Sequence, residues 1–423
     1  MKIAHIAPPL ARTGGASGYL LQLRDGLAGL DAGPHQVIFP DEASGVTAAP
    51  AQSPARRIGG RLKRMLFGKP VFYRPDERAW QQSHGPLDEH ISHAIADMRT
   101  LAESVLARET ENADVLFAHD LGSAEAALER RRKRQSVWLM MHAPMPIALY
   151  LAWNWGVPEQ DWRTVLAYPD VKRWVDRELN VCRRAERLVL PCREAADELA
   201  RCDARFGPLL RKADLVLTGA AAPPAVNARA TRAALRARWY LPIDQRIGLF
   251  IGSAQAYRGL DALLDGLSLL RDDIVIPGTI AVAGPDRATL PVHDRMRVLG
   301  RVEDVTSLLR AVDFVVNVNR FSLFDLSLIE ATEAGLPLLL HDTGGNRTFR
   351  ALGAGVEPLA NLAAATVAAG LERLFGAPQA ELDALGARSR RCYEEHLRPA
   401  QFAARHLALY DKVAGVKRRR ATA

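Results

Sequence analysis

Residues 314–346 read FVVNVNRFSLFDLSLIEATEAGLPLLLHDTGGN, and this stretch contains the pattern that decides the fold. FVVNVN and, further on, LPLLLHD are short apolar runs of the kind that form buried parallel strands. Between them, Asp325 is a favourable N-cap, LSLIEATEA has helical character, and Gly335 is a typical helix-ending residue. The stretch therefore predicts a strand, a helix and a second parallel strand.

The same alternation extends in both directions along the chain. Strand-like runs in the first half are KIAHIAP, HQVIFP, ADVLFAH, SVWLMMH, ERLVLP and DLVLTG, and later ones are RIGLFIGS, GTIAVAG and MRVLG. Helical segments such as 18–30 and 123–133 separate them, and the Pro- and Ala-rich stretch 219–230 is the predicted linker. We expect an α/β fold in which two Rossmann-like, doubly wound parallel sheets face a central cleft.

Three parts of the chain follow from this pattern. Residues 1–222 and 223–395 are the predicted domains, and residues 396–423 are a predicted C-terminal helix that packs back on the first domain and ends in a basic tail. A ligand is expected in the crevice at the carboxyl ends of the strands.

Composition indicates a globular protein, because 48% of the 423 residues are apolar and 25% are charged. No apolar run is long enough to span a membrane, and Pro8 and Pro9 interrupt the apolar start, which makes it a poor secretory signal. We expect a cytoplasmic protein. Its four cysteines lack the paired spacing of a zinc site, so free buried thiols are expected and no metal site is predicted.

Basic residues outnumber acidic ones by 56 to 48 and gather in segments 56–69, 129–134 and 417–420. The first segment mixes its charges with larger apolar residues, as does a helix lying on an anionic membrane. Peripheral attachment to the inner face of the cell membrane is therefore one hypothesis, and a solvated basic face is the other. Nucleic acid is not an expected partner, because no binding module accompanies the charge.

Glu330 is the residue that raises the question of function. A carboxylate among apolar neighbours needs hydrogen-bonding partners or a ligand, unless it lies on a solvated helix face. The predicted helix start offers the backbone N–H groups of Asp325, Leu326 and Ser327 to an anion. A carboxylate close to such a phosphate site is suited to bind a ribose diol, as in dinucleotide folds.

This arrangement resembles the retaining GT-B glycosyltransferases of family 4, the glycosyl transferases group 1. Their signature is E-x7-E followed by a strand and a Gly-Gly turn; Glu330, Phe324 and the sequence EA…AGLPLLL…GG match it. KIAHIAPPLARTGGASGYL also looks like the first strand and glycine loop of the family. The resemblance covers nearly the whole chain and implies a GT-B fold and a nucleotide-sugar donor. It also implies that residues 1–222 bind the acceptor and residues 223–395 bind the donor.

The resemblance also implies roles for individual residues. Glu330 would hold the ribose, and Arg258 stands where the family usually has a lysine that neutralises the diphosphate. His119 would lie against the donor sugar and the acceptor. The full set of predicted donor-binding residues is Gly14, Gly15, Gly252, Ser253, Arg258, Gly300, Val302, Ser322, Asp325, Leu326 and Glu330, and the predicted catalytic residues are His119, Arg258 and Glu330.

Two departures from the family pattern concern the sugar and the diphosphate. Ser322 replaces the first glutamate of the signature, which implies a different sugar or a substitute role for Asp325. Ser253 replaces an arginine, which leaves Arg258 to act alone or with Arg320 or Arg347.

Structural alternatives remain for several of these residues. Gly14 and Gly15 could form only a turn, His119 could be a satisfied strand-end histidine, and Arg258 could be a solvated helix-start residue. His142 is a weaker candidate. Trp153 and Trp155 could stack on a sugar, lie at a membrane interface or belong to the core.

The predicted function is a retaining, metal-independent glycosyltransferase. It would move a sugar from a nucleotide-diphosphate donor to a hydroxyl of a glycan or lipid-linked acceptor, in cell-surface polysaccharide biosynthesis. The donor is a substrate, and no cofactor is predicted. The alternatives are a non-catalytic nucleotide-sugar-binding subunit that supports a partner enzyme, and a peripheral structural protein.

Overall fold

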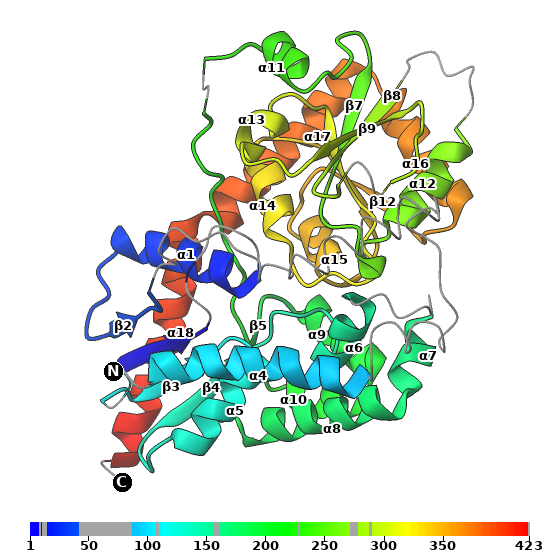
Figure 1. Cartoon of the computed structure of the whole chain (residues 1–423). Coiled ribbons are helices and arrows are strands. Elements are labelled where there is room, and N and C mark those ends of the chain that lie inside the picture. Colours follow the sequence, from blue (N-terminus) through cyan, green and yellow to red (C-terminus); the bar gives the residue numbers. More distant parts are fainter. Residues whose placement is uncertain are drawn as a thin grey trace.

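Two parallel β-sheets form the framework of the protein in a computed structural model (Figure 1). The structure describes residues 1–7, 10, 15–41, 87–106, 110, 112–154, 161–226, 229–270, 278–286 and 290–421. The basic segment 56–69, Gly14 and Trp155 lie outside these residues. The prediction of two doubly wound α/β domains is confirmed.

Each sheet has six strands. The first has the order β2-β1-β3-β4-β5-β6, with β1 Lys2–Ile6, β2 Gln36–Ile38, β3 Val115–Ala118, β4 Ser136–Met140, β5 Arg187–Leu190 and β6 Asp214–Leu215. The second has the order β12-β11-β10-β7-β8-β9, with β7 Arg246–Ile251, β8 Gly278–Ala283, β9 Met296–Gly300, β10 Phe314–Asn317, β11 Leu338–His341 and β12 Val356–Leu359. The strand pairs are parallel, which places the carboxyl ends of neighbouring strands at one edge of each sheet.

Helices cover both faces of the first sheet because its strands are apolar on both faces. In β3, Leu116 and Ala118 belong to the core on one face, whereas Val115 and Phe117 belong to the core on the other. The first-domain helices are α1 Gly15–Ala28, α4 Leu87–Leu106, α5 Leu121–Arg130, α6 Ile147–Asn154, α7 Trp162–Ala167, α8 Pro169–Arg184, α9 Arg193–Cys202 and α10 Gly207–Leu210.

The second domain repeats this layered arrangement. Phe250 of β7 and Val316 of β10 pack in a core with helices α12 and α16, while Leu249 and Val315 face the opposite core. The second-domain helices are α11 Arg232–Arg238, α12 Leu260–Ser268, α13 Val305–Leu309, α14 Leu326–Glu333, α15 Gly344–Ala351, α16 Ala364–Phe375 and α17 Gln379–Cys392.

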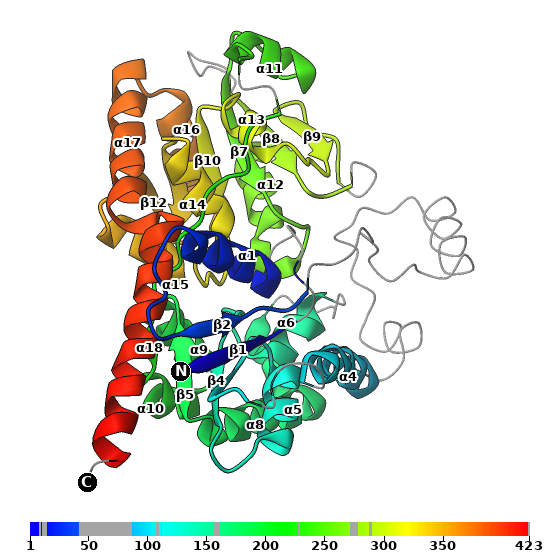
Figure 2. The ribbon, with the colours of Figure 1, turned by 90° about the vertical axis from the view of Figure 1, so that its left-hand side faces the viewer.

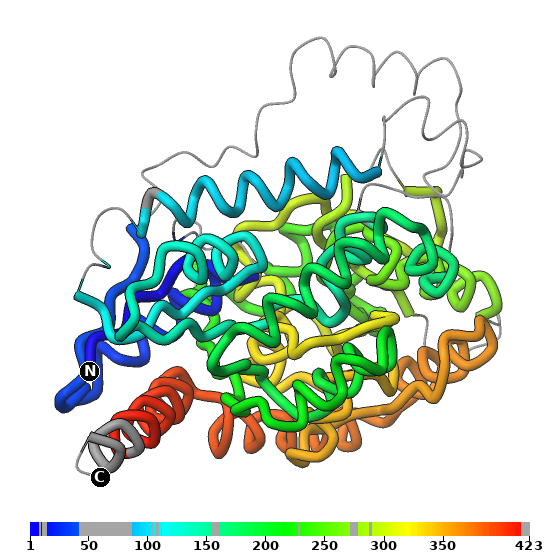
Figure 3. The backbone as a smooth tube through the Cα atoms, turned by 90° about the horizontal axis from the view of Figure 1, so that it is seen from below, coloured from blue at the N-terminus to red at the C-terminus, as the bar shows by residue number. Residues whose placement is uncertain are grey.

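The last helix, α18 Pro399–Ala421, returns from the second domain to the first (Figure 2). It packs against α1, and Phe402 and Tyr410 are fully buried in the core on that face of the first sheet. Figure 3 shows this helix running along one side of the first domain. Among the described residues, no helix is both long enough and apolar enough to cross a membrane.

Candidate functional site

The carboxyl-end loops of the two sheets meet between the domains (Figure 1). Cys192, just after β5, donates its S–H to the carbonyl of Leu323 at 3.5 Å. On the other side, Leu326 at the start of α14 lies against α1, where a Cβ added to Gly18 would be 3.1 Å from its Cδ1. The loop between β10 and α14, which carries most of the signature, is therefore placed at the junction of the domains.

Asp325 precedes α14 as its N-cap, but its side chain makes no capping hydrogen bond. Its Oδ2 instead accepts hydrogen bonds from Arg258 Nη1 at 2.9 Å, Asn317 Nδ2 at 3.0 Å and Asn319 Nδ2 at 2.7 Å. The carboxylate thus fixes Arg258 and leaves the start of α14 without a side-chain cap, so backbone N–H groups there are available to an anion.

Arg258 lies at the end of a short 3-10 turn, Ala256–Arg258, immediately before Gly259 and α12. Its side chain is 22% exposed, and its Nε is buried with no hydrogen-bond partner among the described residues. Burial opposes the charge of the guanidinium, but Asp325 and neighbouring tyrosines outweigh it and raise its pKa. Arg258 is thus a fixed cation with an unused N–H donor, which suits an anionic ligand. Its burial does not fit the alternative that it is a solvated residue at a helix start.

Glu330 lies in the second turn of α14, as predicted, and is partly buried. Among the described residues its carboxylate makes no hydrogen bond and no ion pair. Burial and, secondarily, the nearby Glu333 raise the pKa of Glu330 to about 7. A partly buried carboxylate without a protein partner disfavours the solvated-face alternative and leaves both oxygens available to a ligand.

The structure places the remaining predicted donor-site residues as follows. Gly252 packs against Arg258, because a Cβ added to it would lie 3.5 Å from Arg258 Cδ, and the adjacent Ser253 is exposed. Gly300 has φ +70° and its carbonyl accepts a hydrogen bond from Gly284 N at 2.7 Å. Val302 packs on the core.

Gly15 begins α1 with φ +60°, and an added Cβ there would have no atom within 4 Å. The left-handed backbone therefore favours glycine at this position, while the surroundings would accept a larger side chain.

Ser322 does not reach the cleft surface, contrary to its predicted role with the sugar. It is fully buried, and its hydroxyl donates to Asn346 Oδ1 at 2.8 Å. Its carbonyl accepts a hydrogen bond from Gly345 N at 2.9 Å. Ser322 therefore joins its loop to the Gly-Gly turn rather than offering a group to a ligand.

His119 is also buried, although it was predicted to lie against the donor sugar and acceptor. It is 1% exposed, and both of its ring nitrogens are hydrogen-bonded to other histidines, His5 and His142, each at 2.8 Å. His142, the weaker candidate in the sequence, is the half-buried member of the three.

The two arginines suggested as helpers of Arg258 have other partners. Arg320 forms a two-nitrogen ion pair with Asp261, at 2.9 and 2.7 Å. Arg347 donates to Glu198 Oε1 of the first domain at 3.0 Å. An arginine held by a carboxylate can still bind an anion, as Arg258 beside Asp325 is expected to do, so the suggestion that Arg320 or Arg347 assists at the diphosphate stays a prediction.

Glu198 of α9 is a residue that the sequence did not single out. It is 2% exposed, and its Oε1 also accepts from Thr343 Oγ1 at 3.1 Å and Gly344 N at 2.9 Å, both in the second domain. These contacts join α9 to the start of α15. Nothing in the local pattern of α9 could have indicated them, because the partners lie about 145 residues away in sequence.

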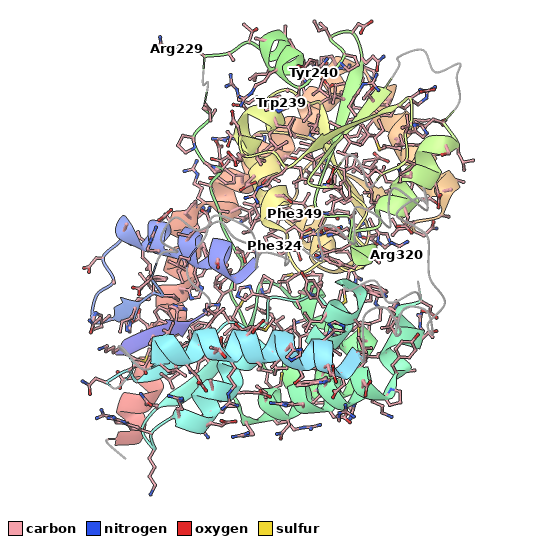
Figure 4. All side chains as sticks on the ribbon, viewed as in Figure 1. Arg229, Trp239, Tyr240, Arg320, Phe324 and Phe349 are labelled. Atoms are coloured by element: carbon pink, nitrogen blue, oxygen red, sulfur yellow. The ribbon has the colours of Figure 1, made fainter. Side chains whose placement is uncertain are left out.

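Aromatic residues complete the contact between the domains. Phe321 is fully buried, and its ring lies edge-on to Trp153 and Trp162 at centroid distances of 5.9 and 5.6 Å, with Arg201 4.4 Å from its centre. Trp153 therefore takes the core role among its three alternatives. Figure 4 shows Phe324, which stacks on Phe349 at 4.4 Å, and Arg320 on the side of the second domain that faces the first.

The four cysteines are buried and free, and within the described ranges no three His, Cys, Asp or Glu side chains are grouped as metal ligands. A cavity of about 470 Å³ lies away from this site, near the amino ends of β10 and β11, with Asp313 and Pro337 in its lining. It shares no residue with Arg258, Asp325 or Glu330, and the charged groups of those three residues favour them over this cavity as the binding site.

Comparison with solved structures defines the fold class of this protein. Sucrose-phosphate synthase from Thermosynechococcus elongatus superposes with a TM-score of 0.64 at 15% identity, covering 98% of this chain and 100% of that one. The Anabaena protein HepE, solved with UDP and glucose, superposes with a TM-score of 0.58 at 13% identity, covering 97% and 100%. This protein therefore has the GT-B fold of two facing α/β domains.

Sequence comparison then identifies one domain of the chain. Residues 245–375 match the family model of the glycosyl transferases group 1, so the chain carries a group 1 glycosyltransferase domain. The resemblance inferred from Glu330 and the Gly-Gly turn is confirmed.

Two curated relatives are similar over part of their length. The D-inositol 3-phosphate glycosyltransferase of Xylanimonas cellulosilytica is 29% identical over 195 residues, 43% of this chain and 46% of that protein. The protein of the same name from Streptomyces avermitilis is 30% identical over 205 residues, 42% and 41%. The match thus spans less than half the length of these relatives.

Proposed function

We propose that this protein is a glycosyltransferase that moves a sugar from a nucleotide-diphosphate donor to a hydroxyl group. The observation that carries the proposal is the partly buried carboxylate of Glu330, which has no partner among the described residues and lies on the helix whose start adjoins Arg258. A ribose diol supplies two O–H donors, which is what an unpartnered carboxylate requires.

The diphosphate would bind between Arg258 and the start of α14. Asp325 holds the guanidinium in place before any ligand arrives, so the positive charge needs no reorganisation when the diphosphate leaves. The uncapped N–H groups of α14 add donors and the positive end of the helix dipole. These fixed groups support leaving-group departure without a metal ion.

The resemblance to family 4 supports retention of configuration, with the acceptor hydroxyl attacking from the face that the diphosphate leaves. The acceptor would bind in the first domain and meet the donor at the domain junction. Two further parts of the proposal rest on the sequence. The acceptor would be a glycan or a lipid-linked molecule in cell-surface polysaccharide synthesis. Residues 56–69 would attach the protein peripherally to the membrane.

A non-catalytic nucleotide-sugar-binding subunit is the second candidate. It is favoured by Ser322, because this position, a glutamate in the family signature, is here a fully buried serine. Binding of a nucleotide sugar without turnover by the purified chain would support this second function.

The first experiment is a thermal-shift screen against UDP, GDP, ADP and their sugar conjugates. A ligand that binds the folded state raises the unfolding temperature, and UDP is the first probe because HepE was solved with it. Glu330→Ala should weaken binding of the stabilising nucleotide roughly 10- to 100-fold, since it removes a charged acceptor of hydrogen bonds.

The matched control is Glu89→Ala, which removes an exposed glutamate from α4 of the first domain. This variant should bind the nucleotide as the wild type does. Unchanged affinity in folded Glu330→Ala, or an equal loss in Glu89→Ala, would contradict the assignment.

A further inference from the structure

The side chain of Arg258 is held at three points along its length. Its Cδ packs against Gly252, its Nη1 donates to Asp325 at 2.9 Å, and its guanidinium carbon lies 5.0 Å from the centre of the Tyr257 ring. Its Nε and Nη2 have no hydrogen-bond partner among the described residues. These two nitrogens form one edge of the guanidinium, and such an edge can donate two parallel hydrogen bonds to a phosphate.

Tyr257 has a fixed backbone and a buried ring. Its carbonyl accepts a hydrogen bond from Arg320 N at 2.7 Å, and only 5% of the residue is exposed. Burial raises the pKa of its hydroxyl above the usual value, so the ring is uncharged at physiological pH. A neutral ring attracts a guanidinium placed over its face and occupies none of its N–H donors. Tyr257 therefore holds Arg258 without competing with an anionic ligand.

The ring of Tyr257 also contacts the first domain, through Tyr150 of α6. The two ring centres are 5.5 Å apart, and the rings are inclined at 51°. α6 lies on the side of the first domain that faces the second (Figure 1), and it packs against the turn that ends in Arg258. Tyr150 thus joins the first domain to the residue that adjoins the proposed diphosphate cation.

α6 is a fixed part of the first domain. Leu149 and Ala152 are fully buried in the core. The backbone N–H of Ile147 donates to Glu178 Oε2 of α8 at 2.8 Å, and Glu178 is itself buried. Tyr150 and Ile147 are half-buried and three positions apart, so they share the helix face that leaves the core. A movement of the first domain therefore carries the Tyr150 ring with it.

The other contacts between the domains involve different partners. Glu198 binds the start of α15, and Phe321 packs against Trp153 and Trp162. Tyr150 contacts Tyr257, which lies beside Arg258 in sequence and under its guanidinium in space. This pair is therefore placed to act on the cation as well as on the domain contact.

We propose that Tyr150 is a positioning residue for the diphosphate. Its ring holds the ring of Tyr257 against Arg258, so that the Nε–Nη2 edge of the guanidinium faces the phosphates only while the first domain is in place. The phosphate part rests on the proposed function, whereas the contact of the three side chains does not.

Loss of the Tyr150 ring has a direct consequence for Arg258. One flank of the Tyr257 ring would lose its cover, and the ring could then change rotamer. The guanidinium would be held through Nη1 alone, so its Nε–Nη2 edge would no longer be fixed toward the ligand. The first domain thereby takes part in holding the cation of the donor site in the second.

Paired affinities for UDP and uridine test this role in the full chain, because only UDP carries the phosphates. Tyr150→Ala should weaken UDP binding roughly 5- to 10-fold, the size expected for a displaced cation–π contact, and leave uridine binding unchanged. Tyr150→Phe keeps the ring and should bind UDP within about 2-fold of the wild type. GDP with guanosine and ADP with adenosine are the further pairs.

Trp162→Ala is the matched control for a merely structural role. It removes another aromatic ring of the first domain from the domain contact, the one that lies edge-on to Phe321 at 5.6 Å. The ratio of the UDP and uridine affinities should stay that of the wild type in this variant.

A double-mutant cycle asks whether Tyr150 acts through Arg258. If it does, Tyr150→Ala should cause no further loss of UDP affinity when it is added to Arg258→Ala. The full 5- to 10-fold loss in the Arg258→Ala background would overturn the proposal. Equal losses for UDP and uridine, or a loss in Tyr150→Phe as large as in Tyr150→Ala, would overturn it as well.

Nitrogen-15 NMR of the Arg258 Nε–H group tests the positioning without any ligand. Aromatic rings shift the signals of nearby hydrogens, so this signal should move in Tyr150→Ala and keep its position in Tyr150→Phe and Trp162→Ala. An unmoved signal in folded Tyr150→Ala would overturn the positioning role. A wild-type protein that binds none of the three nucleotides would count against the proposed function instead, and the NMR result would still decide the contact.

Discussion

Asp325 occupies the N-cap position of α14, but its side chain binds Arg258 and does not cap the helix. The sequence predicts Asp325 as a helix N-cap, and it does occupy that position. Its carboxylate is nevertheless bound to Arg258, Asn317 and Asn319. A cap contributes about 1 kcal/mol, so the protein forgoes a modest stabilisation to fix a cation at the proposed diphosphate site.

Glu330 should reduce the stability of the folded protein at neutral pH. Its pKa is raised from 4.5 to about 7, so the folded state resists its ionisation and stability is lost as the pH rises from about 4.5 through 7. The shift corresponds to at most about 3 kcal/mol. Glu330→Gln should therefore be more stable than the wild type at pH 8 and similar near pH 4.

Urea denaturation at both pH values measures this difference. A Glu330→Gln variant that is no more stable at pH 8 would mean that the carboxylate is already satisfied in the folded protein, which would remove the reason for a ligand. A charged group that has no partner and lowers the stability of the folded protein is typical of functional sites.

At the scale of secondary-structure elements, Gly259 fixes the turn that delivers Arg258. It has φ +69°, and an added Cβ would lie 2.0 Å from the carbonyl oxygen of Val318. Gly259→Ala should therefore lose more than the roughly 1–2 kcal/mol of a left-handed alanine alone, because the turn must also move away from β10. Urea denaturation measures the loss.

Gly353→Ala is the control for backbone strain. Gly353 has φ +84°, but no atom lies within 4 Å of an added Cβ. Gly353→Ala should therefore lose only the stability that a left-handed alanine costs, without a steric collision of its Cβ. If both variants lose equal stability, the close approach of Gly259 to β10 is not important for the turn.

The elements themselves could largely be predicted from the sequence. The helix expected over residues 326–334 is α14, Leu326–Glu333, and MRVLG is β9, because apolar runs and capping residues act locally. The partners of Ser322, Arg320 and Arg347 could not be predicted, because they depend on contacts with residues distant in sequence. His119 was identified as notable, but its burial depends on α1, α18 and two further strands.

At the scale of the whole molecule, Glu198 is the main polar link between the domains. It accepts hydrogen bonds from Thr343, Gly344 and Arg347 and lies 2.5 Å from Arg201. Glu198→Ala should weaken the domain contact by roughly 1–3 kcal/mol, because the buried Thr343 hydroxyl and Gly344 N–H lose their acceptor. Distances between spin labels on the two domains should become longer and more widely distributed.

Glu381→Ala is the matched control, since it breaks an exposed ion pair with Arg373 within the second domain. It should leave the distance distribution unchanged, as exposed pairs contribute little. An unchanged distribution in Glu198→Ala would show that the remaining contacts, among them the aromatic ones around Phe321 and the bond of Cys192 to Leu323, are sufficient to hold the domains together.

The return of α18 to the first domain has a consequence for synthesis on the ribosome. The first domain emerges first, but Phe402, His406 and Tyr410, which fill one face of its sheet, are translated almost two hundred residues after β6. Until then α1 covers only part of that apolar face, and the partners that α18 supplies to His5 and Tyr19 are missing. The nascent first domain is thus a natural client for chaperones, and it acquires its complete core only when translation is nearly finished.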